Sequence, residues 1–204
     1  MFGNLPNYDK INDLCNKHNL YLLDDNAQSF CSTTMQGPGG SWGIASALSF
    51  DPLKPFGSFG GGGAVVTNDH SLYNKIKMMR HQGKDNNVVN TQGYNSKMSE
   101  LDCAVVSFKL TTDEHIERQK VYNQYVHLLD HTTIMKNNEQ IQHNAHKLVI
   151  KTDYRDQLQN YLSGKEIETR AIWPRPIYKE PYFSGSFNCR VTEQLCQSTL
   201  SLPC

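Results

Sequence analysis

An aspartate, a serine and a lysine near short apolar runs are the residues of this sequence best suited to chemistry. Asp25 follows the run at 20–23, Ser49 lies in the run at 45–50, and Lys54 is five residues further on, in a loop rich in proline and glycine. Open α/β sheets bind ligands beyond the carboxyl ends of their strands, so these side chains are placed to share a site. A lysine amine in a partly desolvated pocket loses proton affinity and becomes a nucleophile, which favours Schiff-base chemistry.

Pyridoxal phosphate is a cofactor that needs these chemical types. Its aldehyde takes a lysine, its pyridinium nitrogen takes a carboxylate, and its phosphate takes hydrogen-bond donors. Lys54, Asp25 and Ser49 supply one of each. Spacing alone leaves a simpler interpretation open, because a lysine is rarely buried and an aspartate at a strand end more often caps a turn.

Apolar periodicity predicts the elements that would position these side chains. Helices are expected at 8–18, 71–81, 98–108, 113–130 and 155–162. Buried strands are expected at 20–23, 45–50, 64–67, 148–150 and 167–172, with loops at 51–63 and 84–96. Short strands that alternate with helices are typical of an α/β fold.

Composition and charge exclude other classes of protein. The chain has 204 residues, 20 basic and 20 acidic side chains, and no net charge, which argues against a nucleic-acid surface that neutralises phosphates. No apolar run approaches the ~20 residues that a membrane span needs, and the first residues show no signal peptide, so a cytoplasmic location is expected. The 6 cysteines form no C-x-x-C pair, and we expect reduced thiols and no metal site.

Several segments resemble one known family in residues, order and spacing. They are LDDNAQS at 23–29, GIASALSFDPLK at 43–54, GGGGAVVTND at 60–69, RHQG at 80–83, GYNSKMSEL at 93–101, GKEIETR at 164–170 and LSLP at 200–203. With these segments the sequence resembles the DegT/StrS family of pyridoxal-phosphate-dependent nucleotide-sugar aminotransferases, and the resemblance covers nearly the whole chain.

The resemblance implies residue roles. Lys54 matches the Schiff-base lysine, Asp25 the acid that pairs with the pyridine nitrogen, and Gln28 the residue that contacts the phenolic oxygen of the ring. Ser49 matches a phosphate ligand. Asn95 matches an asparagine that reaches the phosphate held by the neighbouring subunit, which implies a homodimer.

The resemblance also implies a fold and an activity. Residues 1–130 would form part of the large cofactor-binding domain of a fold-type-I (aspartate aminotransferase-like) α/β enzyme, together with a connecting helix. Residues 131–204 would form part of a smaller α+β domain. The implied reaction transfers an amino group, usually from glutamate, to a nucleotide-linked keto-deoxy sugar of polysaccharide biosynthesis.

The sequence departs from the family pattern at its ends and at two residues. Family chains are longer, and their front part supplies a phosphate-binding turn, an aromatic that stacks on the ring, and several strands. The end at 200–204 resembles a point where relatives continue. Lys97 stands where arginine is usual, and Tyr178 where histidine is usual.

These departures leave alternatives open. One is an inactive fragment or pseudoenzyme that needs a partner chain to supply the N-terminal half of the fold. Another keeps the cofactor for sugar dehydration, but Lys54 disfavours it because histidine replaces the lysine in the dehydratase relatives.

Overall fold

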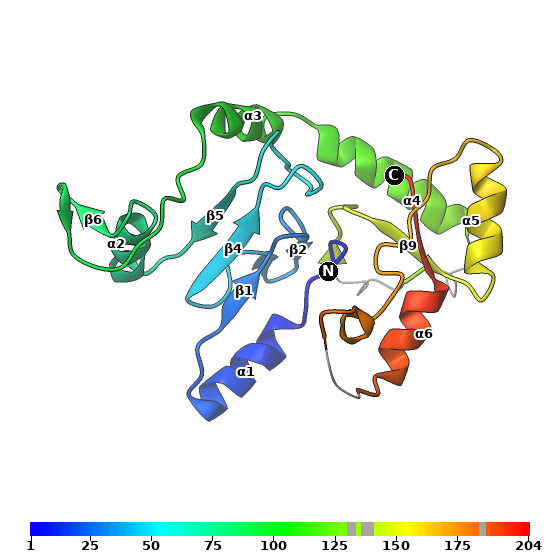
Figure 1. Cartoon of the computed structure of the whole chain (residues 1–204), viewed down its shortest axis with the longest axis horizontal. Helices are drawn as coiled ribbons and strands as arrows, with labels where there is room; N and C mark the ends of the chain where they lie inside the picture. Colours follow the sequence, from blue (N-terminus) through cyan, green and yellow to red (C-terminus); the bar gives the residue numbers. More distant parts are fainter. Residues whose placement is uncertain (130–133, 136–140, 184–186) are drawn as a thin grey trace. The chain divides into compact units, whose positions relative to one another are not determined.

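The computed structural model describes residues 1–129, 134–135, 141–183 and 187–204 (Figure 1). This part of the chain divides into two compact units. The first is built mainly from residues 3–115 and 141–144, and the second from 116–129, 134–135, 145–183 and 187–204. The domain boundary expected near residue 130 stays a prediction, and that residue lies outside the described part.

The first unit contains the three-stranded sheet that carries Asp25 and Ser49. Strand β1 (Leu23–Asp25) runs parallel to β4 (Ala45–Ser49), and β4 pairs antiparallel with β5 (Gly63–Val66). The order is β1-β4-β5, and these strands lie side by side in blue to teal in Figure 1. The strands predicted at 45–50 and 64–67 are confirmed to within a residue.

The first strand begins later than predicted, and the prediction of a buried strand at 20–23 is wrong. Helix α1 (Tyr8–His18) forms as predicted and ends at Asn19, which adopts the left-handed conformation. The amide of Leu20 then bonds back to the last turn of the helix, so the residues after Asn19 form a link instead of a strand. Leu20 and Tyr21 are consequently 62% and 84% exposed.

Helices α2 (His70–Met79) and α3 (Glu100–Leu110) confirm two further predictions to within two residues. Each begins at a side chain that accepts a hydrogen bond from a backbone amide of the first turn. Asp69 caps α2 at 3.0 Å, and Ser99 caps α3 at 3.1 Å. Such caps satisfy amides that have no partner inside the helix.

Short strand pairs occupy segments that were predicted as loops or were not assigned. They are β6 (Lys84–Asp85) with β7 (Val88–Val89), and β2 (Thr33–Thr34) with both β3 (Gly37–Pro38) and β8 (Ile141–Gln142). The β6–β7 hairpin turns at Asn86 and Asn87, which both have positive φ. Asparagine tolerates that conformation, so the asparagine-rich run forms a tight hairpin.

A small apolar core lies beneath the loop that carries Lys54. Phe50, Phe56 and Val106 are 8%, 4% and 5% exposed and pack together. The rings of Phe30 and Phe56 meet edge to face, with centroids 5.1 Å apart. Because Val106 belongs to α3, this cluster joins the loop to that helix.

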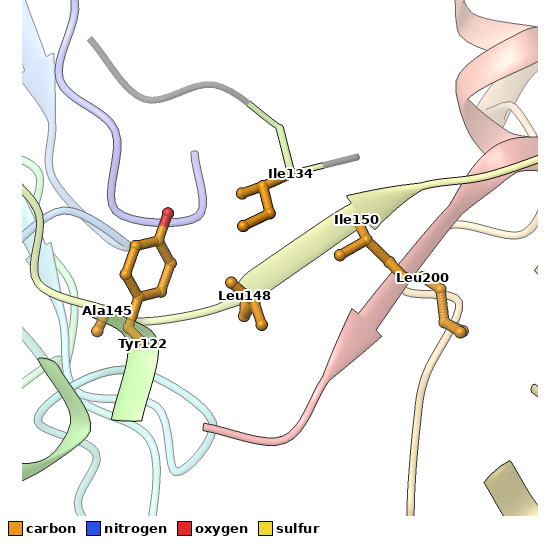
Figure 2. Close-up of a cluster of buried hydrophobic side chains, with 6 residues drawn as sticks. All are labelled: Tyr122, Ile134, Ala145, Leu148, Ile150 and Leu200. Carbon is orange, nitrogen blue, oxygen red and sulfur yellow. The ribbon is translucent and has the colours of Figure 1, made fainter. Parts of the chain in front are cut away.

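The second unit packs helices against a two-stranded antiparallel sheet. Its elements are β9 (Leu148–Lys151), β10 (Thr199–Leu202), most of α4 (Glu114–Leu128), α5 (Arg155–Ser163), the short η1 (Ile177–Lys179) and α6 (Arg190–Ser198). Leu148 and Leu200, on facing strands, are fully buried. Figure 2 shows them in the core cluster with Tyr122, Ile134, Ala145 and Ile150.

The prediction of a strand at 167–172 is wrong. That segment makes a single bridge, between Arg170 and Ser201, whereas β10 occupies the place beside β9. Glu166 turns the chain with a positive φ, and Pro174 and Pro176 follow, which lack the amide that a strand ladder needs. The helix before it ends at Gly164, as predicted.

Candidate active site

Asp25 and Ser49 project from the same face of the three-stranded sheet. Asp25 pairs in register with Ala47 of β4, and Ser49 lies two residues further along that strand. Paired residues on neighbouring strands, and residues two apart on one strand, point to the same side of a sheet. The carboxylate and the hydroxyl are therefore offset by about 7 Å along the strand direction.

Asp24 points to the opposite face and is held in a buried hydrogen-bond network. Its carboxylate accepts from the hydroxyl of Tyr8 at 2.9 Å, from the amide of Gly40 at 3.1 Å, and from the side-chain amide of Asn26. Burial raises the pKa of Tyr8, and the hydrogen bond to Asp24 raises it further. Because Asp24 is fixed inward, the pleat of the strand turns Asp25 outward.

Asn26 extends this network into the turn after β1. It is fully buried, donates to the hydroxyl of Ser46 at 3.1 Å and accepts from the hydroxyl of Ser29 at 2.7 Å. Sequence reasoning missed this network. The available signal was the pair of adjacent aspartates at a strand end, since strand alternation sends one of them inward.

Asp25 precedes that turn, and Gln28 lies within it. Oδ1 of Asp25 accepts from the amide of Ala27 at 3.0 Å, so one carboxylate oxygen does cap the turn. The backbone oxygen of Gln28 accepts from the side-chain amide of Asn144 at 3.0 Å. The register of β1 places Asp25 beside Ala47, near the carboxyl end of β4, and Gln28 follows three residues later in the turn.

Lys54 lies in a tight turn that begins directly after Ser49. The hydroxyl of Ser49 accepts from the amide of Asp51 at 3.4 Å, and the carbonyl of Asp51 accepts from the amide of Lys54 at 2.9 Å. The carbonyl of Lys54 accepts from the amide of Gly57 at 3.1 Å. Asp51 therefore links the backbone of Lys54 to the hydroxyl of Ser49 through two hydrogen bonds. Lys54 itself is half-buried.

Asn95 lies on the segment that follows α2. It is exposed and forms an antiparallel bridge with His81. Among the described residues, no hydrogen bond joins Asn95 to Ser49 or Lys54. Its role in a neighbouring subunit's site stays a prediction.

A cavity of about 500 Å³ lies beside β4, β5 and α2. Its mostly apolar wall includes Ala47, Val65, Tyr73 and Ile76, and Lys77 and Arg80 add positive charges. None of the predicted site residues lines it. Ala47 pairs with Asp25 and precedes Ser49 by two residues, so the cavity opens on the sheet face that carries both side chains.

Two expectations concern metal and membrane. Within the described ranges, no group of three or more His, Cys, Asp and Glu residues could hold a metal ion. None of the helices described above is long and apolar enough to cross a membrane. The six cysteines, all within the described residues, form no disulfide.

Comparisons with known proteins place the chain in a family. The family model of the DegT/DnrJ/EryC1/StrS aminotransferases matches residues 1–204. The chain is 30% identical over 215 residues to the erythromycin biosynthesis sensory transduction protein EryC1 of Saccharopolyspora erythraea. It is 26% identical over 219 residues to the dTDP-3-amino-3,4,6-trideoxy-alpha-D-glucose transaminase of Streptomyces venezuelae. Both matches cover all of this chain but only 58% and 56% of the relative.

A solved structure agrees with this result. The crystal structure of S. venezuelae DesV in complex with a ketimine intermediate matches with a TM-score of 0.92 and 26% identity, over all of this chain and 57% of that one. The chain thus spans somewhat more than half the length of the relatives that it matches. With the predicted α/β fold confirmed by that match, the chain belongs to the DegT/DnrJ/EryC1/StrS aminotransferase family.

Proposed function

We propose that this chain carries the Schiff-base lysine of a pyridoxal-phosphate-dependent aminotransferase that acts on a nucleotide-linked keto-deoxy sugar. The observation that carries the proposal is the shared sheet face of Asp25 and Ser49, with Lys54 joined to Ser49 through Asp51. Family membership supports it, since the S. venezuelae relative is named as a transaminase of a dTDP-linked amino sugar. Glutamate as amino donor and a cytoplasmic location belong to the same proposal.

The residues present fit the cofactor in chemical type. When bound, pyridoxal phosphate supplies an aldehyde that a lysine amine captures with loss of water, and a ring that takes up electron density. Asp25 uses one carboxylate oxygen on the turn, which leaves the second oxygen for a ring N–H. Ser49 accepts from a backbone amide, so its hydroxyl hydrogen can be donated to a phosphate oxygen. Gln28 offers a carboxamide donor to the phenolic oxygen.

Lys54 moves the protons in this proposal. Its amine takes a proton from the carbon next to the donor's nitrogen and returns a proton where the nitrogen is received. Over both halves of the reaction the amino acid becomes a 2-oxo acid and the keto sugar becomes an amino sugar. The donor supplies the two electrons that the sugar takes up, so no outside oxidant or reductant is needed.

A homodimer is part of the proposal. Asn95 is exposed on the segment after α2, which makes its carboxamide accessible to a second copy of the chain. We assign Asn95 to the phosphate of the cofactor held by that copy. Each site of the dimer would then contain a residue from both subunits.

Titration of the purified chain with pyridoxal phosphate tests the proposal. We expect an absorbance band of bound cofactor, and borohydride reduction should fix the cofactor to Lys54, as read by peptide mass. Lys54→Ala should abolish both signals, whereas Lys75→Ala, an exposed lysine on α2, should keep them. Added glutamate should remove the band and yield 2-oxoglutarate. A label on other lysines in the wild-type chain would contradict the assignment of Lys54.

The edges of the sheet favour a second candidate, in which a partner chain completes the fold. In the described sheet β1 and β5 each have one neighbouring strand. Leu23, Val65 and Val66 on these strands are 69%, 48% and 46% exposed. Strand edges with exposed apolar side chains can pair with another strand. The family members of greater length supply a source for such a segment.

The same titration separates the two candidates. If the folded chain alone shows no Lys54-dependent band, the second candidate predicts that co-expression with the remaining part of a family member restores it. Light scattering should then show one copy of each polypeptide per site. A full band from the chain alone would contradict the need for a partner.

A further inference from the structure

Two side chains of α3 hold the loop that carries Lys54. The amide of Gly60 donates to Oδ1 of Asp102 at 2.9 Å, and the ammonium of Lys109 donates to the carbonyl of Gly57 at 2.7 Å. Both contacts reach backbone groups of the loop. They lie on the C-terminal side of Lys54, while strand β4 fixes the N-terminal side.

The two contacts come from one face of the helix. Asp102, Val106 and Lys109 stand at positions i, i+4 and i+7, which lie above one another on an α-helix. Val106 is 5% exposed and packs with Phe50 and Phe56. A polar contact therefore flanks the apolar contact on each side, along about 10 Å of helix.

Gly57 connects Lys109 to Lys54. Its amide donates to the carbonyl of Lys54, and its carbonyl accepts from Lys109. A Cβ at Gly57 would lie 2.5 Å from the carbonyl oxygen of Asp51, so the turn is closed around this residue. A shift of Gly57 must therefore move Lys54 as well.

Hydrogen bonds of Ser58 and Asp102 further restrain the loop. The hydroxyl of Ser58 lies 2.9 Å from the carbonyl oxygens of both Phe50 and Gly60, which closes the loop on itself. Hydrogen bonds from Ser99 and from Gly60 lower the pKa of Asp102. The carboxylate form that accepts the Gly60 amide is thereby favoured, and ionised acceptors make the stronger hydrogen bonds.

We propose that Asp102 and Lys109 are positioning residues that hold the loop so that Lys54 stands beside Ser49, ready to react with the cofactor aldehyde. The inference rests on the proposed function of Lys54 and assigns the control of its placement to α3. Rates of such reactions depend steeply on how well the reacting groups are oriented. Loss of either contact should thus slow the reaction of Lys54 with the cofactor.

Paired variants test each contact. Asp102→Ala and Lys109→Met remove the contacts, whereas Asp102→Asn keeps an acceptor and Lys109→Arg keeps a charged donor. Glu100→Ala is the matched control, because Glu100 is an exposed acid in the same first turn of α3. Thermal unfolding of every variant shows which of them are folded.

Two readouts are needed, one for the loop and one for Lys54. Hydrogen exchange of the peptide spanning 51–62 reports the loop with no cofactor present. The rate at which borohydride fixes pyridoxal phosphate to Lys54, and the pH profile of the absorbance band, report the placement of the amine. We expect exchange about tenfold faster and capture about tenfold slower in Asp102→Ala and Lys109→Met, the size expected for one charged hydrogen bond. Lys109→Arg and Glu100→Ala should stay close to wild type, and Asp102→Asn, which keeps a neutral acceptor, should lie between wild type and Asp102→Ala.

The outcomes separate this inference from the proposed function. Absence of a Lys54-dependent band in the wild-type chain would overturn the proposed function and this inference with it. A normal wild-type band, with exchange, capture and pH profile unchanged in Asp102→Ala and Lys109→Met, would overturn the inference alone. Faster exchange with unchanged capture would show a purely structural contact and would also overturn it. If Lys109→Met does not fold, Asp102→Ala decides, because it removes an independent contact.

Discussion

Asp24 and Asp25 are neighbours in the chain, yet their carboxylates point to opposite faces of the sheet. Asp24 is buried and accepts hydrogen bonds from Tyr8, Asn26 and Gly40. Asp25 is exposed and caps the following turn. An aspartate therefore stabilises the fold at position 24, whereas the aspartate at position 25 is accessible to a ligand.

Asparagine at each of these positions should have a different effect. Asp24→Asn should lower the free energy of unfolding by about 2 kcal/mol, because the charged acceptor of a buried network is lost. Asp25→Asn should change it by less than about 0.5 kcal/mol, as for other surface substitutions, but should weaken binding of pyridoxal phosphate. Urea unfolding and absorbance titration measure the two effects. Equal losses of stability would contradict the opposed orientation of the two carboxylates.

Alkaline pH should destabilise the first unit through Tyr8. Its pKa in the folded state is above the ordinary value of about 10. The contribution to stability is therefore complete below about pH 10 and is lost as the pH rises towards the folded pKa, because the unfolded chain ionises first. Urea unfolding at pH 9 and pH 11 should show a smaller decline for Tyr8→Phe than for wild type. Tyr21→Phe, at an exposed position, should behave as wild type.

Acid pH should destabilise the first unit through Asp102. Its pKa is lowered in the folded state, so its contribution is complete above the ordinary value of about 3.9 and is lost as the pH falls through the folded pKa. We expect the free energy of unfolding to fall less between pH 5 and pH 2.5 in Asp102→Asn than in wild type. An identical acid dependence in both proteins would show that the carboxylate of Asp102 does not stabilise the fold.

Two phenylalanines of the Lys54 loop offer a matched pair for packing. Phe56 is 4% exposed, whereas Phe59 is 78% exposed. Phe56→Ala should cost about 3–5 kcal/mol of unfolding free energy, because it removes a buried ring and leaves a cavity. Phe59→Ala should leave stability nearly unchanged. Denaturant unfolding of both variants gives the comparison, and a large loss in Phe59→Ala would show that its ring is not solvent-exposed.

The sequence predicted those elements whose signals are local. Helices α2 and α3, and the apolar run that became β4, each depend on residues close in the chain. The start of β1 was misplaced because the left-handed Asn19 adds a link that apolarity alone does not reveal. Strand β10 was missed because its pairing with β9 depends on residues about fifty positions apart.

The candidate site shows the same division. Hydrophobic patterning placed Asp25 and Ser49 at strand ends. Only the register of β1 and β4 shows that the two side chains share a face of the sheet. The contacts of Asp102 and Lys109 join residues far apart in the sequence, and no local pattern predicts them. Residue roles came from resemblance and stay predictions until the cofactor titrations are done.

The spacing of Asp102 and Lys109 along α3 fixes the distance between the two points at which the helix holds the Lys54 loop. Each residue of an α-helix turns the chain by about 100° and advances it by about 1.5 Å. One alanine inserted between these two positions would rotate the ammonium of Lys109 away from Gly57. Four inserted alanines would return it to nearly the original direction but about 6 Å too far along the axis. The length of this helix segment, as much as its residues, therefore sets where the loop is held.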